Sequence, residues 1–378
     1  MLTLQAEQDE KWMRKALQLA ERAWGRTSPN PLVGCVIVKD GDVLAEGYHS
    51  APGLDHAERA AINQARQNGV PLTGATLYVN LEPCSHHGRT PPCADLIIES
   101  GIGTVVAAIS DPNPRVAGQG FRKLQNAGIR LRTGVLAAEA QKLNEIFIKY
   151  ITTGLPFILM KSAISLDGKI ATRTGNSKWI SGEVSRQVVH HWRDRVAGIM
   201  VGKNTVLLDN PSLTTRQDDQ PCKNPIRIIV ASTGALPSDS RVFQACPPGG
   251  VILATTSRMP ASSRTALERM GTTVICLDGE DGKVDLWGLV RLLGLRGLDS
   301  IMLEGGGQLN EAFLQAGLID KIMLFMAPKI IGGCDAVSCF NGLGCDRLTD
   351  AVGLDRMTIT PCGDDWLIEG YPQNTKGC

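Results

Sequence analysis

Three segments between His56 and Cys93 constrain this chain more than any other feature of its sequence, because they have to meet at one point. They are His56-Ala57-Glu58, Pro83-Cys84 and Pro91-Pro92-Cys93. A catalytic zinc ion takes three protein ligands from imidazole, thiolate and carboxylate, and keeps a fourth position for a water whose pKa it lowers to about 7. The sequence therefore predicts a fold that brings His56, Cys84 and Cys93 together around zinc.

Glu58 stands two residues after the ligand histidine, at the predicted start of a helix. Its carboxylate can reach the same water there without binding the metal. An ordered His-x-Glu, Pro-Cys and second Cys is the pattern of zinc nucleobase deaminases, in which the Glu carries protons. The eight residues between Cys84 and Cys93 exceed the two of that pattern. A wider loop is compatible with the site if each Pro-Cys pair begins its own helix, whose N-terminal amides favour a thiolate.

A closed structural zinc is the alternative, and it needs four protein ligands. His86 or His87 could supply the fourth. Such a site would leave Glu58 without a role, so the pattern favours a catalytic zinc. The two histidines are then expected on the loop between the cysteines.

The composition bounds the remaining possibilities. A chain of 378 residues is long enough for two domains with separate cores. The balance of 39 basic against 38 acidic residues gives no electrostatic reason to expect nucleic acid or a membrane as partner. Eleven scattered cysteines are not a disulfide framework, and a reduced intracellular setting is expected. With neither a signal-peptide pattern nor a long apolar run, the sequence predicts a soluble cytoplasmic protein.

Strand and helix signals alternate along the chain, which is typical of layered α/β domains. A closing helix over 137–150 and turn residues over 152–156 place the domain boundary near 152, giving domains 1–151 and 152–378. In the first half, strands are expected at 34–39, 43–48, 75–81, 104–109 and 129–133, with helices at 8–24, 56–68, 92–100 and 118–126. In the second half, strands are expected at 157–164, 198–201, 226–230, 251–255, 273–276, 300–303, 321–326, 356–361 and 364–370.

Glu304-Gly305-Gly306-Gly307 follows one of these strands and precedes a helical pattern over 309–314. Backbone amides at a helix N-terminus can hold a phosphate, and glycines allow its close approach. The run is not the Gly-x-Gly-x-x-Gly dinucleotide fingerprint. A glycine triplet by itself is also compatible with a simple turn.

Motifs of the first half resemble the deaminase half of the bifunctional riboflavin biosynthesis deaminase/reductase family. They are Ser28 to Cys35 (SPNPLVGC), Gly47-Tyr48-His49, His56-Ala57-Glu58 and Leu81 to Cys84 through Thr90 to Cys93, and the eight-residue spacing belongs to that pattern. The resemblance implies a cytidine-deaminase-like three-layer domain in which Asn30 holds the pyrimidine edge. His49 and Arg89 become candidate substrate contacts, Arg89 for phosphate. Without the resemblance these would be turn and loop residues.

Motifs of the second half are similar to the reductase half of the same family. They are Lys161 to Gly168 (KSAISLDG), Ser177 to Ile180 (SKWI), Gly202 to Val206 (GKNTV) and Asp209 to Arg216 (DNPSLTTR). The resemblance implies a dihydrofolate-reductase-like α/β domain that uses NADPH. Implied cofactor-binding residues are Ala163, Trp179, Thr205, Asp209, Ser232, Gly306, Gly307, Gln308, Leu309 and Asn310. Implied substrate-binding residues are Lys161, Ser177, Arg193, Leu213, Arg216 and Glu304.

Some of these residues have ordinary alternatives. Arg193 and Arg216 form a natural pair for a ribose 5-phosphate, although surface arginine is the default. Trp179 could instead be a core residue. The proton donor of the reductase step stays open between Lys161 and Asp209, and a lysine at a strand end can equally belong to a salt bridge.

The family resemblance implies two reactions on one phosphorylated pyrimidine, in a chain expected to form a homodimer. The first removes the 2-amino group of 2,5-diamino-6-ribosylamino-4(3H)-pyrimidinone 5′-phosphate, and the second reduces the ribosyl group to ribityl with NADPH. Two alternatives remain. One is a zinc deaminase of free nucleobases or tRNA with a non-catalytic second domain, although an RNA substrate would need a basic face. The other is a non-catalytic nucleotide-binding protein with structural zinc.

Overall fold

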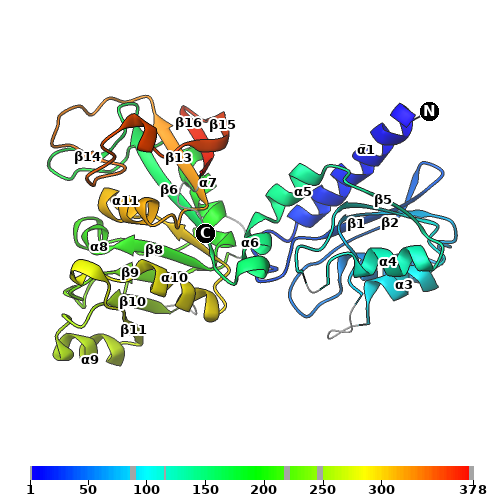
Figure 1. The fold of residues 1–378 in the computed structure, drawn as a ribbon, viewed down its shortest axis with the longest axis horizontal. Coiled ribbons are helices and arrows are strands. Elements are labelled where there is room, and N and C mark those ends of the chain that lie inside the picture. The colour runs from blue at the N-terminus through cyan, green and yellow to red at the C-terminus, as the bar shows by residue number, and fades with distance from the viewer. Residues whose placement is uncertain (1, 86–90, 115, 217–221, 245–249, 374–378) are drawn as a thin grey trace. The chain divides into compact units, whose positions relative to one another are not determined.

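The chain divides into two compact units, residues 1–154 and 155–378, in a computed structural model. The structure describes residues 2–85, 91–114, 116–216, 222–244 and 250–373. Among the described residues, each unit has apolar clusters of its own. Figure 1 shows the helices and strands of both units, coloured along the chain.

A five-stranded sheet with the order β2-β1-β3-β4-β5 forms the centre of the first unit. Its strands are β1 (Gly34–Lys39), β2 (Asp42–Tyr48), β3 (Thr76–Leu81), β4 (Thr104–Ile109) and β5 (Arg130–Thr133). β1 is antiparallel to β2 and β3, whereas β3, β4 and β5 are parallel. β4 is buried throughout and apolar after Thr104, as expected for a strand covered on both faces.

Helices cover both faces of this sheet, which confirms the layered α/β prediction (Figure 1). α1 (Leu2–Glu21) contacts β1, β3 and α5 (Ala137–Leu143). α2 (Ala57–Gln67), α3 (Cys93–Glu99) and α4 (Gln119–Asn126) contact one another in series. The packing on the first face is tight, since a Cβ on Gly34 would lie 2.0 Å from the Ala16 carbonyl oxygen.

The closing helix of this unit differs from the prediction. The expected single helix over 137–150 is broken at Asn144 into α5 and α6 (Glu145–Thr153). The Asn144 side chain accepts the Leu32 N–H at 2.8 Å and donates to the Leu32 carbonyl at 3.0 Å. These bonds fasten the break to a loop 112 residues away. α6 runs to Thr153, so Thr152 and Thr153 are helical, and Gly154 ends the helix with a φ of 71°. The first helix is also shifted, since it ends at Glu21 instead of residue 24.

A nine-stranded sheet with the order β11-β10-β9-β8-β12-β6-β13-β16-β15 forms the second unit. The strands from β11 to β13 are parallel, and β16 and β15 add an antiparallel edge. They are β6 (Phe157–Ser165), β8 (Gly198–Gly202), β9 (Ile226–Val230), β10 (Val251–Thr255), β11 (Thr272–Cys276), β12 (Ser300–Leu303), β13 (Lys321–Ala327), β15 (Leu354–Cys362) and β16 (Asp365–Pro372). β7 (Lys169–Ala171) and β14 (Val337–Ser338) form a separate pair.

Helices connect the parallel strands of this sheet. They are α7 (Glu183–Arg195), α8 (Lys203–Asp209), α9 (Ala261–Arg269), α10 (Leu286–Leu295) and α11 (Gly307–Gln315), together with the 3₁₀ turn η1 (Glu280–Gly282). A second 3₁₀ turn, η2 (Leu348–Asp350), precedes the edge strand β15. Loops that follow neighbouring parallel strands meet at the carboxyl edge of the sheet, where ligands bind in open α/β folds. In the part of the chain that the structure describes, no helix is long and apolar enough to span a membrane.

Candidate active sites

The first unit brings the predicted ligands together at the N-terminal ends of two helices. His56 precedes α2, Cys93 begins α3, and Cys84 lies three residues beyond the end of β3. The Nδ1 atom of His56 lies 3.5 Å from the Cys84 Sγ and 3.4 Å from the Cys93 Sγ. Cys84 does not begin a helix, contrary to the expectation, because the chain there leaves β3 as an irregular loop.

This geometry fits zinc. The three ligand atoms lie within 4.8 Å of one another. A tetrahedral zinc with ordinary bond lengths separates a nitrogen from a sulfur ligand by about 3.6 Å, close to both observed distances. The hydrogen bond between Cys93 and Cys84 lowers the pKa of the Cys84 thiol to about 4 and, followed by burial, raises that of Cys93. His86, His87 and Arg89 lie outside the described residues.

Glu58 lies in the first turn of α2 and is 3% exposed. Burial, followed by the charge of Cys84, raises the pKa of its carboxyl to about 7. A group with such a pKa both takes and gives a proton near neutral pH. Among the described residues, those with ligand atoms close enough to share a metal ion are His56, Cys84 and Cys93, and Glu58 is not one of them. The carboxyl is therefore available as a proton carrier.

Asn30 and His49 form a hydrogen-bonded pair at the same site. The Asn30 Nδ2 lies 3.1 Å from the His49 Nε2, and the His49 Nδ1 lies 3.1 Å from the Asp55 carbonyl oxygen. The carbonyl can only accept, so Nδ1 carries the proton and Nε2 accepts from the amide. Burial lowers the pKa of His49, which keeps the ring neutral. Its edge contacts His56 with the centroids 5.5 Å apart.

The sequence did not single out the support behind Cys84. Glu82 accepts N–H bonds from Asp111 at 3.0 Å, Gly118 at 2.9 Å and Phe121 at 3.2 Å. A Cβ on Gly120 would lie 2.0 Å from the Pro83 carbonyl oxygen. The start of α4 therefore packs directly behind the ligand loop. In the sequence, Glu82 is marked only by its place two residues before Cys84.

In the second unit, the implied cofactor residues gather at the carboxyl edge of the parallel sheet. Ser232 follows β9, Thr205 and Asp209 belong to α8 after β8, and residues 306–310 begin α11 after β12. The order β9-β8-β12 makes these three strands neighbours. The Gly-rich run is thus a strand-to-helix connection, as expected. The backbone packs closely at Gly307, where a Cβ would lie 2.3 Å from the Ser338 carbonyl oxygen, so this position requires glycine.

Asn310 and Trp179 occupy contrasting environments. The Asn310 amide donates to the Cys339 carbonyl at 3.0 Å, while its buried Oδ1 has no hydrogen-bond partner among the described residues. An unsatisfied buried acceptor is an available contact for a ligand. Trp179 is 65% exposed, so it is not a core residue. The Arg186 guanidinium lies 4.8 Å from its ring centroid, and Lys329 donates to its carbonyl at 2.9 Å.

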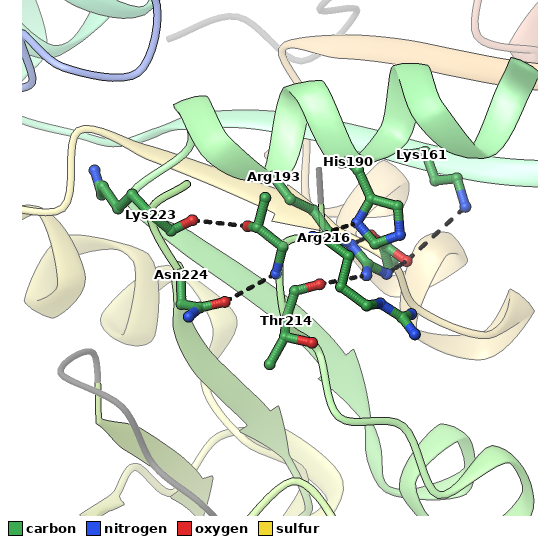
Figure 2. Close-up of polar contacts among 9 residues, drawn as sticks. Lys161, His190, Arg193, Thr214, Arg216, Lys223 and Asn224 are labelled. Atoms are coloured by element: carbon green, nitrogen blue, oxygen red, sulfur yellow. Dashed lines mark hydrogen bonds and ion pairs between the residues drawn. The ribbon is translucent and has the colours of Figure 1, made fainter. Parts of the chain in front are cut away.

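A charged network connects the implied substrate residues (Figure 2). The Arg193 guanidinium binds both carboxylate oxygens of Glu304, at 2.8 and 2.9 Å, and donates to the Thr214 carbonyl at 3.0 Å. The Lys161 Nζ lies 3.9 Å from a Glu304 oxygen. Burial alone would raise the pKa of Glu304, but the charges of Arg193 and Lys161 outweigh it and lower the pKa to about 2. Glu304 therefore stays ionised.

Three other implied residues are placed differently. Ser177 donates to the Asp209 carboxylate at 3.0 Å, which joins a substrate candidate to a cofactor candidate. The Leu213 side chain is 4% exposed in an apolar cluster, so its backbone is the part available to a ligand. Arg216 is exposed beside His190, a residue that the sequence analysis did not select.

Fold and sites together define the class of protein: a zinc-dependent deaminase unit followed by a nucleotide-dependent reductase unit. Comparison with known families agrees. Residues 6–109 match the cytidine and deoxycytidylate deaminase zinc-binding region, and residues 156–368 match the RibD C-terminal domain.

Similar proteins cover almost the whole chain. The riboflavin biosynthesis protein RibD of Actinobacillus pleuropneumoniae is 43% identical over 96% of this chain and 94% of its own, and that of Escherichia coli is 41% identical over 95% and 98%. The solved structure of Acinetobacter baumannii RibD has a TM-score of 0.85 at 35% identity, covering 97% of this chain and 99% of its own. A Thermotoga maritima diaminohydroxyphosphoribosylaminopyrimidine deaminase/5-amino-6-(5-phosphoribosylamino)uracil reductase has a TM-score of 0.84 at 38% identity, covering 98% and 100%.

The chain belongs to the RibD family of riboflavin biosynthesis proteins and is a bifunctional deaminase and reductase whose cofactors are zinc and NADPH. The matches to both halves do not favour a deaminase with a non-catalytic second domain.

Proposed function

We propose that the first unit removes the 2-amino group of 2,5-diamino-6-ribosylamino-4(3H)-pyrimidinone 5′-phosphate as ammonia, and that the second unit reduces the ribosyl side chain to ribityl. The observation that carries the proposal is the convergence of His56, Cys84 and Cys93, with a buried Glu58 beside them. The substrate is the one implied by the family.

In the deamination step, His56, Cys84 and Cys93 hold the zinc. Zinc held there would lower the pKa of a water and so supply the nucleophile for the ring carbon that bears the amino group. Glu58 takes a proton from this water and delivers it to the departing ammonia, a task suited to a pKa of about 7. Asn30 binds the pyrimidine edge. His49 turns the amide of Asn30 and fixes which of its atoms faces the pyrimidine, so it acts through Asn30.

In the reduction step, NADPH supplies the hydride and the protein supplies binding and orientation. Ser232, Thr205, Asp209 and residues 306–310 bind the cofactor along the carboxyl edge of the sheet, and Trp179 covers it. Glu304 binds donor groups of the substrate, and Arg216 binds its phosphate. Burial lowers the pKa of Lys161, which makes its ammonium a better proton donor than an ordinary lysine. We assign Lys161 this role in preference to Asp209, which already accepts the Ser177 hydroxyl.

A single assay tests both halves. Purified protein of known zinc content is mixed with the diaminopyrimidinone phosphate, and ammonia and NADPH absorbance are followed together. Release of ammonia with oxidation of NADPH is the expected result. Ammonia without oxidation would contradict the reductase assignment, and neither product from zinc-loaded protein would contradict the substrate.

A further inference from the structure

One face of α7 holds the segment that carries Arg216. His190, Arg193 and Asp194 lie at positions i, i+3 and i+4 of this helix and therefore on the same side. Each binds a backbone group between α8 and β9. His190 accepts the Arg216 N–H at 3.2 Å, and Arg193 donates to the Thr214 carbonyl at 3.0 Å. Asp194 accepts the Lys223 N–H at 2.6 Å. Figure 2 shows His190 and Arg193 directed from the helix towards Thr214 and Arg216.

The bond from Arg216 fixes the chemical form of His190. A backbone N–H can only donate, so the His190 Nδ1 accepts and the ring proton lies on Nε2. The ring is neutral at physiological pH, because burial, followed by the charges of Arg193 and Arg216, lowers the pKa of His190 to about 4. A protonated ring would have no acceptor at Nδ1. Burial and the surrounding cations thus keep His190 in the form that holds the Arg216 backbone.

Arg193 and Arg216 are not equivalent. The Arg193 guanidinium donates hydrogen bonds to both carboxylate oxygens of Glu304 and to the Thr214 carbonyl, and the Arg193 side chain is 12% exposed. Arg216 is exposed, and its guanidinium has no ion pair within the described ranges. Arg193 is therefore a partner of Glu304. Among the described residues, no side chain takes up the Arg216 guanidinium donors, which leaves them for an anionic group, and their position depends on the Arg216 backbone.

We propose that His190 is a positioning residue of the reductase site, which acts by holding the backbone of Arg216 so that the Arg216 guanidinium meets the phosphate of the substrate. The proposal rests on the proposed function for the nature of the substrate. The contact between His190 and Arg216 can be tested without any substrate, so the two can fail separately.

The contact itself is tested by hydrogen exchange of the whole protein. Replacing His190→Leu removes the acceptor, and His190→Asn keeps it, because the amide oxygen is attached at the same position in the side chain as Nδ1. Exposed Gln187, one turn earlier on α7, provides the control Gln187→Leu. We expect faster exchange at the Arg216 amide in His190→Leu alone, with the Thr215 amide, bonded to Asn224 at 2.9 Å, unchanged in every variant. Unchanged exchange at Arg216 in His190→Leu would overturn the proposal whatever the enzyme acts on.

The consequence for the reaction is tested by kinetics of NADPH oxidation with the deaminated substrate. His190→Leu should raise the KM for the pyrimidine about 3- to 10-fold, the worth of one hydrogen bond, and leave the KM for NADPH unchanged. His190→Asn should restore most of the loss. In an Arg216→Met background, His190→Leu should have no further effect on this KM, because His190 acts through Arg216.

Other outcomes have distinct meanings. An additive effect of His190→Leu in the Arg216→Met background would overturn the proposal. So would an equal rise in both KM values, which is what a general disturbance of the unit would cause. If the wild-type protein oxidised no NADPH with this substrate while exchange at Arg216 responded as expected, the proposed function would fail and the contact would stand.

Discussion

The two sites of this chain are built in opposite ways. The proposed zinc ligands and Glu58 fall within 38 residues, on two helix starts and one loop, and the three ligand atoms lie within 4.8 Å of one another, as a shared metal requires. The charged network of the reductase joins Lys161, Arg193 and Glu304 from three distant parts of the chain, with Arg193 and Glu304 111 positions apart. Arg193 and Glu304 pair directly, without any added group. A metal site can be recognised from the order of its ligands in the sequence, whereas a pair of distant side chains is specified by the fold.

Removal of zinc should separate the two sites most completely. Dialysis against a chelator is expected to reduce ammonia release to background, because His56, Cys84 and Cys93 lose the group they hold. Oxidation of NADPH with substrate that is already deaminated should continue at the original rate. Metal analysis before and after, and recovery on adding zinc, complete the measurement. A parallel loss of NADPH oxidation would show that the reductase site also depends on zinc, and would contradict the contrast between the two sites.

Glu58→Gln should lower ammonia release by about 10²- to 10⁴-fold, the usual contribution of a proton-transfer group. The amide cannot carry the proton, yet it is similar in size, so zinc content should equal that of the wild type. The reductase activity of the same preparation serves as the internal control. Retention of more than a tenth of the deaminase rate would contradict the assignment of Glu58 as proton carrier.

Arg193→Met should cost about 3–5 kcal/mol in the free energy of unfolding, because it leaves the Glu304 carboxylate buried without its main partner. The chain offers a matched control in Arg347, which makes the same two-point contact with Asp350 but has a side chain 76% exposed. Arg347→Met should cost about 0–1 kcal/mol. Urea unfolding of both variants measures the difference. Equal losses in the free energy of unfolding would show that burial does not determine how much the Arg193–Glu304 pair contributes to stability.

The smallest effect is expected from pH. The pKa of His190 lies near 4 in the folded protein, against an ordinary value of 6.5. Between these values the unfolded chain binds a proton that the folded chain resists, so stability falls as pH is lowered from about 6.5. His190→Asn should lose less stability than the wild type between about pH 7 and pH 5, measured by urea unfolding. Working above the titration of Glu304 keeps that group out of the comparison. If the free energies of unfolding of the wild type and of His190→Asn changed in parallel with pH, a neutral His190 ring in the folded protein would be refuted.

What the sequence could predict follows from the same contrast. The meeting of His56, Cys84 and Cys93 and most strand positions were predictable, because ligand chemistry and apolar runs are local properties of the sequence. The break at Asn144 was not, since it is imposed by bonds to Leu32 across the unit. The partner of His190 is a backbone N–H, which every residue but proline has, so no motif marks it. The two-point pairing of Arg193 with Glu304 likewise depends on the fold, because the two residues are far apart in the sequence.

The glycine that ends α6 has a practical consequence for protein engineering. Gly154 closes the first unit, and every side chain assigned to the deaminase lies before it, while every side chain assigned to the reductase lies after it. A gene divided between codons 154 and 155 would yield two polypeptides, each with its own apolar core and a whole set of catalytic groups. Mixing the halves in unequal amounts would then let the ratio of the two activities be set by expression instead of by covalent linkage.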